Sequence, residues 1–293
     1  MKKWFFFSLL VLFVTGCSNR PKSCPCNRPI ALVSIAPYQH LVERIAGPYL
    51  SVQTIVPQNT NPHAFEPTAR QVLELAQGVV WFRIGEPFED KILPIMKERN
   101  HDLWILDLRE GIDLIPESAD HLHCHHCAME HLDRHIWMSP KLTKIQVEAI
   151  VDMLRERFPE HALEFEQNGM RLLQDLTELD LEIAALLEPV QKRQILVSHP
   201  AFGYFCRDYG IEQLSVEYEG KDPRPRHLEK ILDKAVENTL QFSLALPQYN
   251  NKGAQLIAER LHVPVKWIDP YSPDYFDTMR HLAHLIADSE NDQ

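Results

Sequence analysis

The sequence predicts an α/β fold with two lobes, each a parallel β-sheet flanked by helices, joined by one long rigid linker helix. Short apolar runs alternate with helically spaced segments in both halves of the chain, which is typical of parallel sheets covered by helices. Between the halves, the residues from Pro159 to just before Pro189 have the spacing of one helix, about 45 Å long at 1.5 Å per residue. The length of 293 residues suits two lobes better than a single core.

The first half contains four predicted strands separated by helices. The strands occupy 30–35, 50–57, 79–85 and 102–108. The helices occupy 38–47, 69–77, 87–99 and 139–158. Thr68 and Gln71 have the spacing of a capping box, which predicts where the second helix begins. We therefore expect an N-terminal α/β lobe over residues 29–158.

The second half repeats this alternation after the linker helix, which we assign to residues 159–188. Its strands occupy 193–198, 211–218, 241–248 and 263–270. Its helices occupy 201–210, 224–239, 252–261 and 273–288. We therefore expect a C-terminal α/β lobe over residues 189–293. Gly169 is the weak point of the linker helix, because glycine costs about 1 kcal/mol relative to alanine inside a helix.

The N-terminal residues have the features of a bacterial lipoprotein signal. A basic start, MKK, precedes the apolar run WFFFSLLVLFV, which is too short to span a bilayer, and VTGC resembles a lipobox. This predicts a signal peptide over 1–16, acylation of Cys17 and a lipidated tether over 17–28. The protein would then be anchored by lipid on the periplasmic or cell-surface side of a bacterial membrane. The alternative is an ordinary signal peptide with a chance cysteine.

Charge and cysteine content narrow the possible classes. The formal charge is −11 and no Lys/Arg cluster is present, which argues against a nucleic-acid-binding protein. Outside the cytoplasm disulfides can form, so Cys124 and Cys127 could pair with each other or with Cys24 and Cys26. Cys206 is predicted to be a buried free thiol.

Three histidines lie where predicted strands give way to loops. They are His63 in NPHAFEPT, His135 in DRHIWMSP and His199 in VSHPAFGYF. The carboxyl ends of parallel strands usually line a ligand-binding crevice, and the nearby prolines stiffen each loop. The spacing alone is not a metal signature. The shared placement nevertheless predicts one metal site between the lobes.

These motifs, together with YGIEQLS and DPRPRHLEKIL, resemble the periplasmic zinc-binding proteins of ABC importers, the ZnuA/TroA-like group. The resemblance covers roughly residues 28 to 288 in order. It implies that His63, His135 and His199 bind the metal. It also implies a role for Asp269 in the last strand-to-helix connection, either as the fourth ligand or as a hydrogen-bond acceptor for a ligand histidine. If Asp269 does not bind the metal, water is the expected fourth donor.

Two further carboxylates, Glu66 and Glu217, fit better as loop and surface residues than as ligands. The manganese-binding branch of the family tends to carry glutamate in place of His199. Imidazole suits Zn²⁺, whereas Mn²⁺ prefers more oxygen ligands. Since ligation needs neutral imidazole, affinity should fall as the pH drops below about 6.5.

The resemblance implies an extracytoplasmic, high-affinity Zn²⁺-binding protein and not an enzyme. It would act as a monomer and deliver zinc to an ABC permease with its ATPase. The alternatives are the same role with Mn²⁺ or Fe²⁺, a zinc hydrolase using three histidines and water, and a lipoprotein adhesin with the same fold.

A His/Cys-rich loop over residues 119–132 precedes the second ligand motif. Its candidate accessory metal ligands are His121, His123, Cys124, His125, His126, Cys127 and His131. In position it resembles the His-rich loop of zinc-binding family members. Reduced cysteines and histidines could hold an extra zinc ion, whereas oxidised cysteines would leave only the histidines. The loop is either a second, weaker zinc site or a segment without an essential role.

Overall fold

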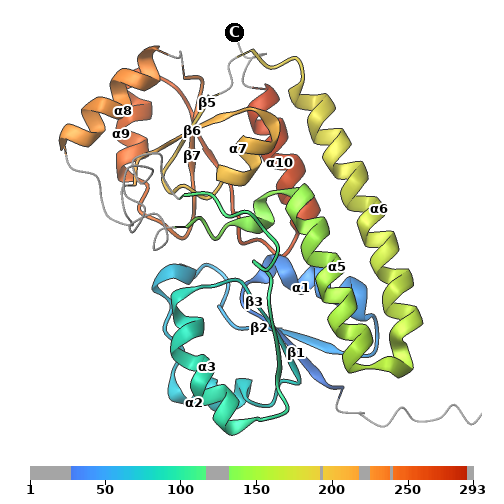
Figure 1. Ribbon diagram of the computed structural model, residues 1–293. Coiled ribbons are helices and arrows are strands. Elements are labelled where there is room, and N and C mark those ends of the chain that lie inside the picture. Colours follow the sequence, from blue (N-terminus) through green and yellow to red (C-terminus); the bar gives the residue numbers. More distant parts are fainter. Residues whose placement is uncertain (1–27, 117–131, 192–193, 218–224, 238–239, 289–293) are drawn as a thin grey trace, which may run out of the picture.

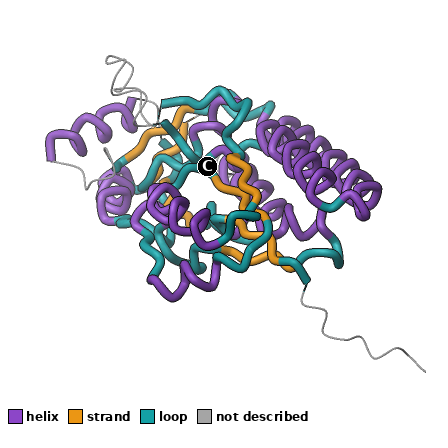
Figure 2. Tube along the Cα trace, turned by 60° about the horizontal axis from the view of Figure 1, so that its bottom comes forward, coloured by secondary structure: helices purple, strands orange, loops and turns teal. Residues whose placement is uncertain are grey.

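The computed structural model describes residues 28–116, 132–191, 194–217, 225–237 and 240–288. It contains two four-stranded parallel sheets with helices around them, as predicted (Figures 1 and 2). The signal peptide, Cys17 and the tether, with Cys24 and Cys26, lie outside the described residues. So do all seven candidate ligands of the His/Cys-rich loop. Among the described residues, no helix is both long enough and apolar enough to cross a membrane.

The first sheet has the strand order β2-β1-β3-β4. Its strands are β1 (Ile30–Val33), β2 (Ser51–Thr54), β3 (Val80–Arg83) and β4 (Trp104–Asp107). The connecting helices are α1 (Ala36–Ala46), α2 (Ala69–Leu75) and α3 (Pro87–Arg99). Thr68 and Gln71 form the predicted capping box at the start of α2. All four strands are parallel, so their carboxyl ends meet at one edge, where the loops after β2 and β3 lie.

The second sheet repeats this topology with the order β6-β5-β7-β8. Its strands are β5 (Gln194–Val197), β6 (Glu212–Ser215), β7 (Ser243–Ala245) and β8 (Val265–Trp267). The helices are α7 (Gly203–Tyr209), α8 (Pro225–Glu237), α9 (Lys252–Leu261) and α10 (Tyr275–Ala287). The strands are shorter than predicted because the parallel ladder stops where the chain turns towards the loops. Cys206 in α7 is a buried free thiol, as predicted.

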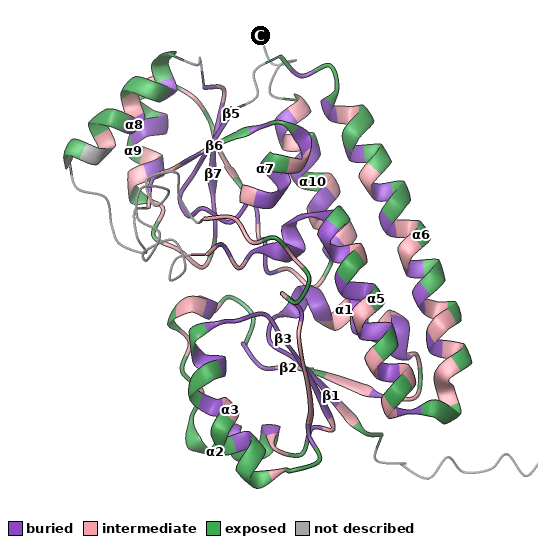
Figure 3. Ribbon diagram, in the orientation of Figure 1, coloured by how far each residue is buried: buried purple, intermediate pink, exposed green. Residues whose placement is uncertain are grey.

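Two long helices connect the sheets. They are α5 (Pro140–Arg157) and α6 (Ala162–Leu187), separated by a single 3-10 turn, η4 (Pro159–His161). The predicted linker helix thus begins with this turn, and its α-helical part is about 39 Å long at 1.5 Å per residue. One face of α6 is buried and the opposite face is exposed (Figure 3). Along this buried face it packs against α1 and α5 and, nearer its C-terminal end, against α10 (Figure 1).

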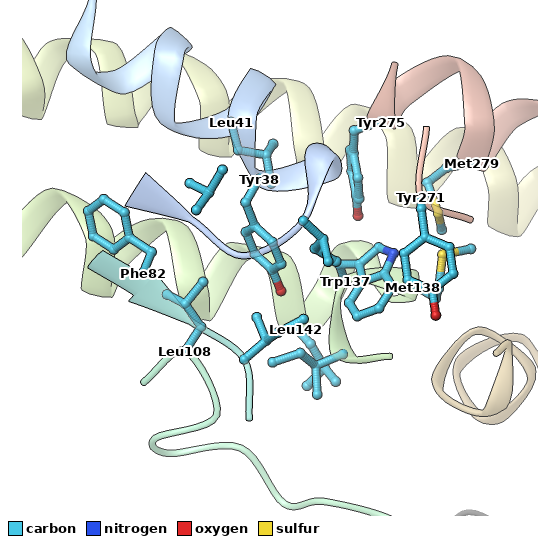
Figure 4. Packing of buried hydrophobic residues seen from close by; sticks show 14 of the residues in the cluster. Tyr38, Leu41, Phe82, Leu108, Trp137, Met138, Leu142, Tyr271, Tyr275 and Met279 are labelled. Atoms are coloured by element: carbon cyan, nitrogen blue, oxygen red, sulfur yellow. The ribbon is translucent and has the colours of Figure 1, made fainter. Parts of the chain in front are cut away.

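One large apolar core continues from the first sheet into the second. Tyr38 of α1, Trp137, and Tyr271 and Tyr275 from the last part of the chain lie in the same cluster (Figure 4). The indole N–H of Trp137 donates to the carbonyl of Pro270 at 2.8 Å. This shared core holds the loops at the two sheet edges in a fixed relation to each other.

Gly169 is a close-packing position and not a weak point of the linker helix. The helix runs through it without a break, and the residue is buried. A Cβ built at Gly169 would lie 2.4 Å from Cγ2 of Val151, so glycine allows α5 and α6 to approach closely. The helical cost of this glycine is offset by the packing that it permits.

We expect Gly169→Ala to destabilise the metal-free protein. Crowding against Val151 costs about 1–3 kcal/mol, and the better helix propensity of alanine returns about 1 kcal/mol. Urea unfolding should therefore show a net loss in the free energy of unfolding for Gly169→Ala. This loss should be smaller in a Val151→Ala background, because Val151→Ala removes the crowded methyl group. A gain in stability from Gly169→Ala in both backgrounds would contradict close packing.

Candidate metal centre

Three histidines from three separate loops converge between the two sheets. His63 lies in the 3-10 turn η1 (Pro62–Ala64), in the connection between β2 and α2. His135 caps the 3-10 turn η3 (Ile136–Met138), and His199 follows β5 by two residues. One ring nitrogen of each lies within 4.8 Å of those of the other two. The three predicted ligands are therefore brought together.

The ring nitrogens are spaced for one small cation. His199 Nε2 lies 3.3 Å from His63 Nε2 and 3.2 Å from His135 Nε2. A tetrahedral zinc ion with bonds of 2.0–2.1 Å has ligand atoms about 3.3–3.4 Å apart. The observed separations match this edge length closely.

A carboxylate lies behind each imidazole. In every pair, Nδ1 of the ring is 2.7–2.8 Å from a carboxylate oxygen. The pairs are His63 with Glu86, His135 with Asp133 and His199 with Glu217. Since a carboxylate oxygen accepts, we assign the proton of each ring to Nδ1, which leaves a lone pair on each Nε2. Such pairs orient metal-binding histidines and make them more basic ligands.

The three lone pairs require a cation between them. Lone pairs about 3.3 Å apart repel one another unless a proton or a metal ion lies between them. Protonation is disfavoured at His199, because burial and then the neighbouring His135 and His63 hold its pKa well below 6.5. This site therefore favours a metal ion over added protons near neutral pH.

Glu86 is the most deeply buried of the three carboxylates. It follows Gly85, whose φ of +86° suits glycine, and precedes Pro87 at the start of α3. Glu89 holds this corner by accepting the backbone N–H groups of Ile84 and Gly85. The corner aims Glu86 at His63 without exposing it to solvent.

Glu86 remains ionised in spite of its burial. Burial is the largest single effect on the pKa of Glu86 and raises it, but the charge and hydrogen bond of His63 act in the opposite direction. With further contributions from His135 and Arg134, the pKa falls below its usual value. The negative charge is therefore available to polarise the imidazole of His63.

Asp133 fixes the second histidine at two points. One carboxylate oxygen accepts from the backbone N–H of His135 at 2.8 Å and from its Nδ1 at 2.7 Å. The hydroxyl of Tyr204 donates to the carbonyl of Asp133 at 2.7 Å. Gly203 makes room for this carboxylate, since a Cβ there would lie 2.6 Å from Asp133 Oδ2. Helix α7 of the second lobe thus supports His135.

The two glutamates considered in the sequence differ in their placement. Glu66 is exposed and pairs with Lys91 on the surface, as expected for a loop residue. The interpretation of Glu217 as a surface residue was wrong, because its carboxylate accepts from His199 Nδ1 at 2.7 Å. It follows the end of β6, and parallel pairing of β5 with β6 brings it beside His199.

Asp269 does not join the group formed by the three histidines among the described residues. Its Oδ1 accepts from Gln248 Nε2 and from the backbone N–H of Tyr271, both at 2.8 Å. Direct ligation by Asp269 stays a prediction.

The base of the His/Cys-rich loop lies next to the centre. Pro116 and Leu132 form an antiparallel bridge, and the N–H of Asp133 donates to the carbonyl of Ile115. The loop between these ends therefore starts and finishes beside the carboxylate that holds His135.

The sequence interpretation missed four residues of the centre. They are Glu86, Asp133, Tyr249 and Tyr271. The position of Glu86 after a strand at the same sheet edge as the loop of His63 was an available signal. For Asp133 the signal was its place two residues before His135, since aspartate often accepts the N–H two residues further on. No comparable signal was available for the two tyrosines.

We expect Glu86→Gln to weaken zinc binding by about 10- to 100-fold, because the neutral amide no longer polarises His63. Competition with a chromogenic chelator measures this change. The matched control is Glu66→Gln, which removes an exposed carboxylate next to the same motif. Equal affinities for the two variants would rule out a role for the Glu86 charge.

The lowered pKa of His199 predicts a pH-dependent stability of the metal-free protein. Below pH about 6.5 the unfolded chain takes up a proton at this residue, whereas the native protein does not. The contribution of neutral His199 to the free energy of unfolding is therefore fully present above pH about 6.5. It is lost as the pH falls towards the native pKa, by up to about 1.4 kcal/mol per pH unit. Between pH 7 and 5, the free energy of unfolding measured with urea should fall less steeply with pH for His199→Gln than for the wild type. An unchanged slope would argue against a neutral native His199.

Known proteins are similar to this chain over most of its length. The family model of the periplasmic component A of zinc-uptake complexes, ZnuA, matches residues 32–289. A putative metal-binding protein of Chlamydia trachomatis is 31% identical over 281 residues, covering 95% of this chain and 98% of its own. The zinc-binding lipoprotein AdcA of Streptococcus pneumoniae (strain R6) is 24% identical, covering 87% of this chain and 51% of its own.

A solved structure is similar to this chain in fold as well as in sequence. The crystal structure of a ZnuA deletion mutant lacking residues 138–173 of that protein, with zinc bound, superposes with a TM-score of 0.82. It is 31% identical and covers 91% of this chain and all of its own. The chain therefore belongs to the ZnuA family of periplasmic zinc-uptake components.

Proposed function

We propose that the protein is a high-affinity Zn²⁺-binding protein that delivers its metal to an ABC permease driven by an ATPase. The observation that carries this proposal is the set of three imidazoles, each backed by a carboxylate, with Nε2 atoms at zinc-ligand separations. The family to which the chain belongs and its relatives are metal-binding proteins and not enzymes.

Zinc is favoured over manganese by the donor set. Three neutral nitrogen donors suit Zn²⁺, whereas Mn²⁺ prefers carboxylate and water oxygens. The buried carboxylates Glu86 and Asp133 do not supply such oxygens, because each is occupied by the Nδ1 side of a histidine. The zinc-bound structure of a 31% identical family member supports the same choice.

A hydrolase is disfavoured for a related reason. Such an enzyme needs a general base beside the metal-bound water. The three carboxylates nearest the histidine rings lie on their Nδ1 side, away from the Nε2 atoms that face the metal. They are placed to orient ligands and not to accept a proton from water.

We propose further that a lipid on Cys17 anchors the mature protein at the outer face of a membrane and that it works as a monomer. The lipobox-like VTGC supports the anchor, and the similar AdcA of Streptococcus pneumoniae is a lipoprotein. The lipid would keep the protein near a permease in the same membrane. The His/Cys-rich loop, whose ends lie beside Asp133, would act as a second and weaker zinc site.

Metal analysis tests these proposals directly. The wild-type protein should prefer Zn²⁺ to Mn²⁺ in chelator competition and hold one zinc ion tightly. The triple mutant His63→Ala, His135→Ala, His199→Ala should lose that ion, because none of the three imidazole nitrogens remains. Deleting residues 121–131 should remove only weakly bound zinc.

Tight binding of zinc by the triple mutant would overturn the assignment of the centre. A wild-type preference for Mn²⁺ would overturn the assignment of the metal. Unchanged stoichiometry after the loop deletion would end the proposal of a second site without affecting the first.

A further inference from the structure

The hydroxyl of Tyr271 lies beside one of the three histidine nitrogens that converge at the centre. Tyr271 is 7% exposed, and its hydroxyl oxygen lies 3.1 Å from His135 Nε2. This separation is close to the 3.2 and 3.3 Å that separate the histidine nitrogens. It is also close to the edge of about 3.3 Å expected for a tetrahedral zinc site. The oxygen therefore lies at the distance of a fourth donor from a metal-binding nitrogen.

The position of Tyr271 is fixed from several directions. Its backbone N–H donates to Asp269 Oδ1 at 2.8 Å. Its ring lies beside Trp137, with centroids 5.4 Å apart (Figure 4). Its hydroxyl is 2.7 Å from that of Tyr249, whose ring stacks on His199 at 3.8 Å and 7°. The tyrosine pair thus links the imidazoles of His135 and His199.

The hydrogen bonds allow this hydroxyl to turn towards a metal. Because Nδ1 of His135 donates to Asp133, its Nε2 is an acceptor, and the Tyr271 hydroxyl donates to it. A metal ion on that Nε2 takes up the same lone pair. The Tyr271 hydroxyl can then donate to the oxygen of Tyr249, which leaves a lone pair of its own oxygen facing the metal. No proton has to leave the site.

We propose that the hydroxyl oxygen of Tyr271 is the fourth donor to the bound metal and that Asp269 positions Tyr271 instead of binding the metal itself. The inference rests on the proposed function and concerns the same centre. Asp269 already accepts two hydrogen bonds through Oδ1, one of them from Tyr271. A neutral hydroxyl is a weaker donor than a carboxylate, which suits a protein that must release its metal to a transporter.

Four variants separate a donor role from a positioning role. Tyr271→Phe keeps the ring and removes the oxygen. Asp269→Asn keeps an oxygen that can accept from the Tyr271 N–H, whereas Asp269→Ala removes it. Tyr275→Phe is the matched control, since this buried hydroxyl contacts Thr143 in the same core. A urea unfolding curve of each metal-free variant verifies that the variant is folded before metal is added.

Zinc affinity and the visible spectrum of the Co²⁺-substituted protein are the two measurements. Tyr271→Phe should weaken zinc binding by about tenfold or more and change the Co²⁺ spectrum, because the donor set changes. Asp269→Ala should weaken zinc binding in the same direction. Asp269→Asn should restore both wild-type affinity and the wild-type spectrum, a rescue that a ligating carboxylate would not show. Tyr275→Phe should match the wild type in both.

Two outcomes would overturn the inference. If Tyr271→Phe keeps the wild-type affinity and spectrum, Tyr271 is not the fourth donor. If Asp269→Asn loses affinity and changes the Co²⁺ spectrum, the aspartate is the ligand. Both differ from failure of the proposed function, in which the wild-type protein itself would show no tight zinc binding.

Discussion

The hydrogen bonds between three buried or partly buried carboxylates and the Nδ1 atoms of three histidines organise this molecule. Each bond places the ring proton away from the centre, so that the Nε2 lone pairs converge on one point. Burying carboxylates costs several kcal/mol per ion unless partners compensate. Here the imidazoles supply part of that compensation, and a cation between the three rings would add to it. The charges and ring orientations that favour a metal ion are thus already present in the metal-free fold.

The sheet topology explains why these groups meet. Glu86 follows β3, His199 follows β5 and Glu217 follows β6, while His63 lies in the connection after β2. In parallel sheets the carboxyl ends of all strands share one edge, so each of these loops opens towards the same space. The core that continues through Trp137 and Tyr271 holds the two edges together (Figure 4). The long helix α6 supports this core from outside (Figure 1).

The three histidines are not equivalent. The side chains of His135 and His199 are each 1% exposed, whereas that of His63 is 21% exposed. His135 precedes the linker helix in the chain, yet the neighbouring Asp133 and Trp137 bond to Tyr204 and Pro270 beyond that helix. His135 and His199 therefore form one buried pair attached to the second sheet. His63 completes the centre from the first sheet and is the most exposed of the three.

The alternation of strands and helices, the long linker helix and the three histidines at strand ends could all be predicted from the sequence. These follow from local periodicity, from proline and capping signals, and from the rule that parallel strands present their carboxyl ends together. The tertiary structure was needed to pair Glu86 with His63 and Glu217 with His199. Glu217 looked like a surface residue because its partner, His199, lies on a neighbouring strand and not nearby in the chain. Gly169 looked like a flaw because the methyl group of Val151 that excludes a larger residue belongs to another helix. In the same way, nothing local distinguishes Tyr271, whose hydroxyl acquires its place from contacts with Tyr249 and His135. Periodicity reports which face of an element is buried, but the partner of a buried polar group is set by packing between distant segments.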